Sequence, residues 1–128
     1  MPVDTEFSLR LPNSPGALAD LCAALAAEHV NIVALSLESG GQLRLVVDNP
    51  VRTEGVLRER RHKVASREVV TAPVEHRAGG LAPIVRLLAT AGVNVEYAYS
   101  GGGTGGMHAT IVLGVDDAIR AATAAGIG

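Results

Sequence analysis

The chain has 128 residues, of which 48% are hydrophobic and 19% charged, and this composition excludes an intrinsically disordered chain. Its formal net charge of −2 argues against a general binder of nucleic acids or membrane surfaces. The one cysteine, Cys22, has no second cysteine with which to form a disulfide, and residues 1–6 lack the basic and apolar regions of a signal peptide. We therefore expect a soluble cytoplasmic protein.

The first half of the chain predicts strands and helices in alternation. Its first strand and first helix are followed by a second strand over residues 30–37 and a glycine turn at Gly40 and Gly41. A second helix is expected from Pro50, because proline suits the first helical turn, and a fourth strand over residues 63–66. The apolar positions of the first strand, the first helix and the third strand are Phe7, Leu9 and Leu11; Leu18, Leu21, Cys22 and Leu25; and Leu43, Leu45 and Val47.

The second half predicts the same order of elements. Pro73 interrupts its first strand, which suits an edge or a bulge, and Gly92 is expected to end its first helix in the left-handed conformation. A second strand over residues 93–99 and a glycine turn over residues 101–106 follow, and the last helix starts near Asp116. The apolar positions of these elements are Val70, Ala72 and Val74; Leu81, Ile84, Val85 and Leu88; Ala109, Ile111 and Leu113; and Val115, Ala118, Ile119 and Ala122.

The two halves also share residues at a fixed spacing. Residues 16–32 align without a gap to residues 79–95, and seven of the 17 pairs are identical. This offset of 63 predicts a duplication of a ferredoxin-like β-α-β-β-α-β unit in the α+β class. We expect the two units to span residues 1–66 and 67–128, with the second lacking most of its last strand.

The turn over residues 11–18 carries the main candidate site. Ser14 or Asn13 is expected to cap the following helix with a side-chain oxygen, with Pro15 at its first position. Gly16 leaves backbone N–H groups uncovered, so that the helix start is open to a small anion such as a carboxylate. The alternative is a well-capped helix with no ligand.

This turn and the second strand resemble motifs of the ACT domain family. The family often shows an Asx-x-Pro-Gly-x-Leu turn, matched by residues 13–18, and a Gly-Ile/Val-Asn-Ile strand start, matched at residues 30–32 and 92–95. The resemblance covers nearly the whole chain and implies binding of a free amino acid at an interface between paired domains. Carried over, it implies a site at Asn13, Ser14, Pro15, Gly16, Ala17, Leu18, Asn31 and Ile32, and a second at His76, Arg77, Ala78, Gly79, Gly80, Leu81, Asn94 and Val95.

The second half departs from the family pattern. His76 stands in place of the Asx residue and Ala78 in place of proline, so it is open whether one or both units bind. Arg77 is either a partner for a ligand carboxylate or a solvated loop residue. Glu96 is a candidate for a ligand ammonium group, and Tyr97 or Tyr99 for a ligand side chain; the alternative is that these tyrosines lie at an interface, where tyrosine is ordinary.

Other constellations do not assemble a catalytic, metal or cofactor site. The glycines at positions 101, 103 and 106 match a dinucleotide pattern, but a strand and not a helix is expected after them. The histidines His29, His62, His76 and His108 have no metal-ligand spacing, and Asp116 and Asp117 suit the start of a helix. A basic cluster suggests RNA or an acidic partner, but helix ends attract basic residues and no aromatic residue is interleaved for base stacking. Its members are Arg58, Arg60, Arg61, His62, Lys63 and Arg67.

We therefore expect a regulatory or sensor protein that binds a free amino acid and is not an enzyme. The expected partners are that amino acid, a second copy in a homodimer and an amino-acid metabolic enzyme, with no cofactor, nucleic acid or membrane. One alternative is a ligand-free interaction module that acts as a regulatory subunit of such an enzyme or of a transporter. The other is a small enzyme with a cryptic site.

Overall fold

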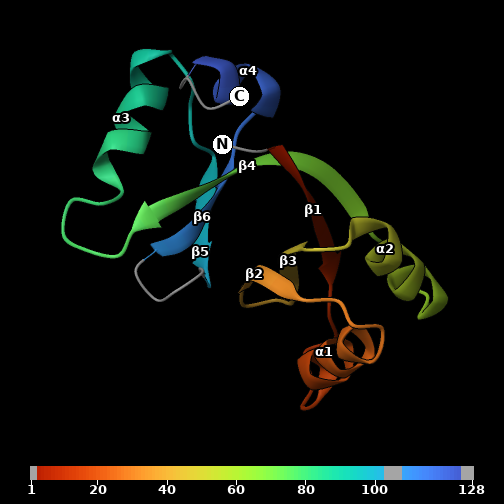
Figure 1. The fold of residues 1–128 in the computed structure, drawn as a ribbon. Coiled ribbons are helices and arrows are strands. Elements are labelled where there is room, and N and C mark those ends of the chain that lie inside the picture. Colours follow the sequence, from red (N-terminus) through yellow and green to blue (C-terminus); the bar gives the residue numbers. More distant parts are fainter. Residues whose placement is uncertain (1–2, 103–107, 125–128) are drawn as a thin grey trace. The chain divides into compact units, whose positions relative to one another are not determined.

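The computed structural model of the protein describes residues 3–102 and 108–124, and the chain divides into two compact units (Figure 1). The N-terminal unit is Thr5–Arg67, and the C-terminal unit is Glu68–Gly128 with Met1–Asp4, as far as these are described. The expected turn over residues 101–106 lies largely outside the described residues. No helix within the described part of the chain is long and apolar enough to cross a membrane.

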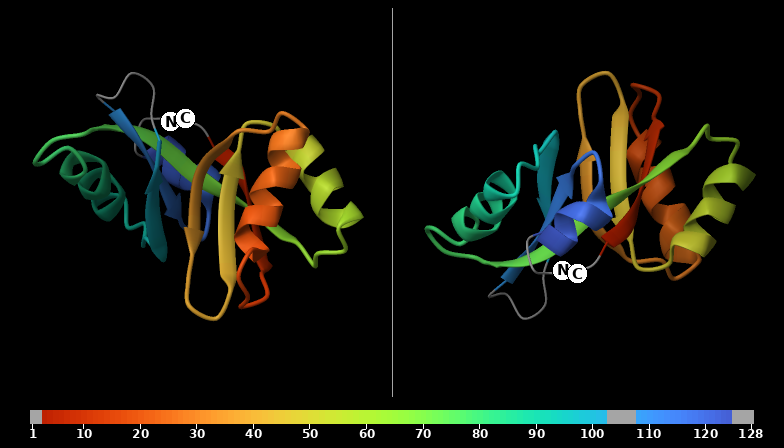
Figure 2. Two further views of the ribbon diagram at one scale, coloured as in Figure 1. Left: turned by 90° about the horizontal axis from the view of Figure 1, so that it is seen from below. Right: turned by 90° about the horizontal axis from the view of Figure 1, so that it is seen from above.

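The N-terminal unit is a three-stranded antiparallel sheet with two helices. The central strand pairs with both neighbours, so that Leu45 stands opposite Phe7 on one side and Leu35 on the other. Both helices lie on the same face of this sheet (Figure 2). The elements are β1 (Val3–Arg10), α1 (Ala17–Ala27), β2 (Ile32–Leu37), β3 (Gln42–Val47) and α2 (Pro50–Glu59).

Alternation along the strands and helical spacing along α1 build the core of this unit. Leu25 on α1, Leu43 on β3 and Leu57 on α2 are fully buried in one cluster. Burial of a leucine side chain contributes about 2 kcal/mol, so these contacts hold the helices against the sheet. The expected first strand, first helical stripe and third strand of this unit are confirmed. Pro50 stands at the start of α2, as expected, and the Asn49 side chain before it accepts a hydrogen bond from the Arg52 amide.

The start of α1 differs from the prediction. The residue before the helix is Gly16 with a φ of +88°, and no side chain caps the helix, so capping by Ser14 or Asn13 is wrong. Pro15 precedes the helix and does not occupy its first position. The reason is the left-handed Gly16, which turns the chain so that the backbone carbonyl of Ser14 accepts the Ala17 amide at 3.3 Å.

The C-terminal unit has the same order of elements. Its central strand β6 pairs antiparallel with β4 and β5, and its core contains Leu88 from α3, Leu113 from β6 and Ala121 from α4. Val3 also packs against this core, and the Thr71 hydroxyl donates to the Asp4 carboxylate. The elements are β4 (Ala65–Glu75), α3 (Ala82–Thr90), β5 (Tyr97–Gly101), β6 (His108–Gly114) and α4 (Ala118–Ala124).

Three strands differ from their expected limits, and the first of them is β2, which begins at Ile32 and not at residue 30. The separate strands expected at residues 63–66 and 70–74 are one continuous strand, β4, because residues 67–69 contain no turn former and Val69 is fully buried. Pro73 lies in register opposite Thr110 without a bulge. The strand expected over residues 93–99 begins only at Tyr97, after the Glu96 amide donates to Gly114 at 2.8 Å.

The helices of the C-terminal unit bury less than their sequence patterns predict. Three members of the expected apolar stripes, Leu81, Val85 and Ile119, are 41%, 36% and 60% exposed. Leu81 is the residue before the first helical residue, and in α3 only Leu88 is fully buried. A stripe at the margin of a short helix therefore remains in contact with solvent.

The ends of α1 and α3 match in detail. Gly92 has a φ of +74°, as predicted for a left-handed helix end, and His29 occupies the corresponding place with a φ of +58°. The amide of Val30 donates to Leu25 at 3.0 Å, and the amide of Val93 donates to Leu88 at 2.9 Å. These are the bonds of the Schellman motif, which closes the last helical turn.

Candidate ligand-binding site at the α1 turn

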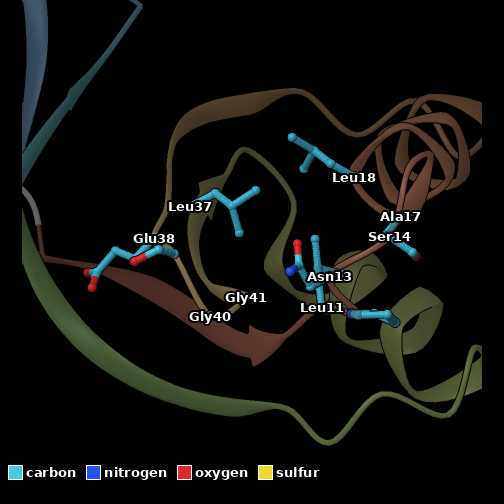
Figure 3. A pocket seen from close by; sticks show the side chains of 11 residues that line it. Leu11, Asn13, Ser14, Ala17, Leu18, Leu37, Glu38, Gly40 and Gly41 are labelled. Carbon is cyan, nitrogen blue, oxygen red and sulfur yellow. The ribbon is translucent and has the colours of Figure 1, made fainter.

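A hollow of about 140 Å³ lies between the turn that leads into α1 and the turn between β2 and β3 (Figure 3). All of its lining belongs to the N-terminal unit. The lining residues are Leu11, Pro12, Asn13, Ser14, Ala17, Leu18, Leu37, Glu38, Ser39, Gly40 and Gly41.

Two glycines shape the floor of this hollow. Gly40 and Gly41 both have a φ of +92°, a conformation that side chains strongly disfavour. The Leu11 amide donates to the Gly41 carbonyl at 2.8 Å, which holds the two turns together. The Arg10 guanidinium donates to the Gly40 carbonyl, so the end of β1 supports the same floor.

The walls of the hollow are partly apolar and partly polar. Leu18 and Leu37 point toward one another, and the Asn13 amide points into the space beside them (Figure 3). The Glu38 carboxylate points away and pairs with Arg44 at 3.1 Å. The hollow thus offers aliphatic surface from Leu18 and Leu37 and polar groups from Asn13, Ser14 and Ser39, which suits a ligand with both apolar and polar parts.

The start of α1 adds a region of positive potential at this hollow. The first turn of a helix leaves N–H groups without intrahelical partners, and its dipole favours an anion. Ala17 and Leu18 of this turn both line the hollow, and no side chain caps the helix. An uncapped helix start beside a hollow is suited to bind a carboxylate.

The structure brings together only part of the predicted first site. Asn13, Ser14, Ala17 and Leu18 line the hollow, whereas Pro15 lines a neighbouring hollow of about 260 Å³. Two further members lie elsewhere in the unit. Ile32 packs against the core, and Asn31 is exposed, with its amide bound to the Asp48 carboxylate at 2.9 Å.

The β2–β3 side of the hollow was not predicted from the sequence. Leu37 ends a strand and is 43% exposed, and nothing in its spacing distinguishes it from a core leucine. Gly40 and Gly41 were interpreted as turn formers, which they are. Sequence gives the turn but not its position beside the start of α1.

In the C-terminal unit the corresponding turn is closed by its own residues. Gly79 has a φ of +79°, and a Cβ on Gly80 would stand 2.0 Å from the Glu75 carbonyl oxygen. The Gly80 amide donates to Arg77 at 3.0 Å. His76, Ala78 and Leu81 are exposed in or beside this turn.

Arg77 is already engaged by a neighbour in this turn. Its guanidinium donates to the Glu75 carboxylate, and this hydrogen bond and charge, with a smaller contribution from His108, lower the Glu75 pKa. The other two residues predicted for the second site are Asn94 and Val95. Asn94 is exposed, and Val95 packs against the core of the C-terminal unit, so the two do not join Arg77 in this turn.

Further residues of interest have local structural roles. The rings of Tyr97 and Tyr99 are stacked with centroids 6.4 Å apart, and Tyr97 covers Gly114, where a Cβ would lie 2.2 Å from the ring. Cys22 is half-buried on α1. Among the described residues no group of three or more His, Cys, Asp or Glu side chains is placed to hold a metal ion.

The two units share one order of strands and helices, β-α-β-β-α, in the described part of the chain. Solved structures share this α+β fold. Protein BT0572 from Bacteroides thetaiotaomicron matches with a TM-score of 0.83 and 26% identity, over 95% of this chain and 85% of that chain. No family model and no curated protein matches significantly.

Two further similar structures come from aspartate kinases. The ligand-free regulatory subunit of aspartate kinase from Thermus thermophilus has a TM-score of 0.69 and 16% identity, over 98% of this chain and 92% of that chain. The structure of aspartokinase alpha and beta subunits has a TM-score of 0.65 and 17% identity, over 96% of this chain and 92% of that chain. At these identities the likeness shows the fold alone.

Proposed function

We propose that the chain is a tandem ACT protein that binds a free amino acid as a regulatory signal and catalyses no reaction. The observation that carries this proposal is the hollow beside the uncapped start of α1. The fold shared with a regulatory subunit of aspartate kinase supports a regulatory role.

An amino acid fits the chemistry of this hollow in one orientation. Its carboxylate faces the amide of Leu18 in the first turn of α1, where the helix dipole favours negative charge. Its ammonium group faces the amide oxygen of Asn13. Its side chain lies between Leu18 and Leu37, which favours an aliphatic residue.

The second unit is proposed to be a second ACT repeat with a weaker site or none. Gly16 and Gly79 are 63 residues apart and share the left-handed conformation, and the Schellman ends of α1 and α3 have the same spacing. The Arg77–Glu75 pair occupies the corresponding turn, so we assign the ligand to the N-terminal unit. Because ACT sites commonly lie at interfaces, we also propose a homodimer whose second chain covers the hollow.

The test is thermal unfolding of the purified chain with each of the twenty amino acids at millimolar concentration. A ligand at about 100 times its Kd stabilises the folded state by about 2.7 kcal/mol, which is a shift of several degrees for a chain of this size. We expect one or two amino acids to raise the Tm selectively.

Two exposed leucines provide matched variants for this test. Leu37 and Leu87 are 43% and 46% exposed, but only Leu37 lines the hollow. Leu37→Ala is expected to abolish the selective shift, whereas Leu87→Ala should retain it. An unchanged Tm with all twenty amino acids would refute the proposal and favour the ligand-free subunit of an amino-acid metabolic enzyme.

A further inference from the structure

A larger hollow of about 580 Å³ lies on another side of the same turn, and basic residues contribute to its largely apolar lining. Arg10 at the end of β1 and Arg61, His62 and Lys63 after α2 contribute to its lining, and no carboxylate does. These residues are close in space but 51 or more positions apart in sequence from Arg10. The volume is in the range of sites for small molecules.

The backbone explains how the three residues after α2 reach this place. Arg61 has a φ of +63°, and its amide donates to Arg58 while the His62 amide donates to Leu57 at 3.0 Å. This left-handed end reverses the chain and directs residues 61–63 to the hollow beside Leu11 and Pro12. A non-glycine residue in this conformation is disfavoured by about 1 kcal/mol, so the position retains an arginine against its backbone preference.

Interaction with the dipole of α2 does not explain why Arg10, Arg61 and Lys63 gather at this hollow. Arg58 lies in the last helical turn and pairs with Glu54 at 3.1 Å, as expected for a helix end. Arg61 and Lys63 lie beyond the helix, and Arg10 comes from a strand. Among the described residues, no ion pair neutralises these three cations, although Arg10 donates to the Gly40 carbonyl.

We propose that this hollow binds a phosphorylated small molecule with several negative charges, such as a polyphosphate group. Two guanidinium groups and one ammonium group supply charged donors, and arginine binds phosphate oxygens in a bidentate manner. The apolar surface of Leu11 and Pro12 accommodates an uncharged part of the ligand. The cations meet in one hollow whose lining has no Phe, Tyr or Trp side chain for base stacking, which favours a small molecule over single-stranded RNA.

The test is calorimetric titration of the full chain with tripolyphosphate at low and moderate salt. The matched variants are Arg61→Gly with Lys63→Gln, which removes two charges from the hollow, and Arg86→Gln, which removes an exposed charge on α3. Glycine suits the left-handed position of Arg61, so the double variant is expected to fold as stably as the parent.

We expect tripolyphosphate to bind the parent and Arg86→Gln with Kd values within about twofold, and to bind the double variant at least about tenfold more weakly. Equal weakening in Arg86→Gln, or no binding to the parent, would overturn the proposal. Single-stranded RNA that binds the hollow with an affinity rising with its length would overturn it in favour of nucleic acid. This test does not depend on the amino-acid proposal, because no amino acid is present.

Discussion

The carbonyl oxygen of Leu11 lies 2.2 Å from the point where a Cβ on Gly41 would stand. The same two residues are joined by a 2.8 Å hydrogen bond from the Leu11 amide to the Gly41 carbonyl. The end of β1 and the β2–β3 turn therefore touch backbone to backbone. This contact sets the distance across the floor of the ligand hollow, and only glycine allows it.

Gly41→Ala is expected to lower the free energy of unfolding by about 2–4 kcal/mol, because it adds backbone overlap to an unfavourable φ. Gly40 is the matched control, since it has the same φ of +92° but its Cβ would approach only the Arg10 guanidinium at 3.7 Å. Gly40→Ala should therefore lose only about 1 kcal/mol. Urea denaturation measures both, and equal losses would contradict the role of the Leu11 contact.

His29 and Gly92 give a second matched pair, at the ends of α1 and α3. Both are left-handed, so His29→Gly is expected to raise the free energy of unfolding by about 1 kcal/mol, and Gly92→Ala to lower it by about the same amount. Denaturant unfolding of the two single variants measures these changes. Destabilisation by His29→Gly would show that the imidazole contributes more than the backbone conformation costs.

These helix ends show what the sequence allowed us to predict. Periodicity located α1, α3 and α4 and most of the described strands, because buried positions such as those on α1 and β3 repeat at regular spacings, and Pro50 located α2. Gly92 was predicted as a left-handed end because glycine is the residue that favours it. His29 adopts the same conformation, but its residue type carries no such signal, and it was not predicted.

The differences arise where local signals compete with packing. Asn13 and Ser14 are good caps by type, but the left-handed Gly16 places the helix start beyond their reach. Residues 63–74 contain a strand signal on each side of Arg67, and only the fold decides that they form one strand. The wall contributed by Leu37 depends on how β2 and the α1 turn meet in space, and no sequence spacing encodes this contact.

Variants of Gly16 and Gly79 test which of the two units holds the proposed amino-acid site. A Cβ at either glycine would meet no atom within 4 Å, so Gly16→Ala and Gly79→Ala are both expected to cost only about 1 kcal/mol of stability through their positive φ. Only Gly16→Ala should weaken binding of the selected amino acid, since it shifts the first turn of α1. Calorimetry on both variants checks this, and equal weakening would assign ligand to both units.

The Glu75–Arg77 pair predicts a pH dependence. The Arg77 hydrogen bond and charge lower the Glu75 pKa in the folded state. A lowered carboxyl pKa gives stability that is present above the ordinary carboxyl pKa and is lost as pH falls through the folded pKa. Arg77→Gln should therefore raise the Glu75 pKa in a carboxyl NMR titration, and because the pair is exposed the stability change should be small. An unchanged titration would contradict the pairing.

The two proposed ligands are expected to interact, because Leu11, Pro12, Asn13 and Gly40 line both hollows. A polyphosphate adds negative charge near the position assigned to the amino-acid carboxylate, and it competes with Gly40 for the Arg10 guanidinium. Both effects disfavour simultaneous binding. Saturating tripolyphosphate should therefore weaken the affinity for the selected amino acid by about fivefold, at the low end of typical coupling between sites.

Linkage requires the amino acid to weaken tripolyphosphate binding by the same factor, and this reciprocity is measured by titrating each ligand in the presence of the other. The coupling should decrease as salt rises, since it is mainly electrostatic. At a tripolyphosphate concentration that just saturates the parent, the weakening of amino-acid binding should be smaller in the Arg61→Gly, Lys63→Gln variant, which retains the amino-acid hollow but loses two cations of the other. An equal weakening in this variant at that concentration would place the anion elsewhere on the chain.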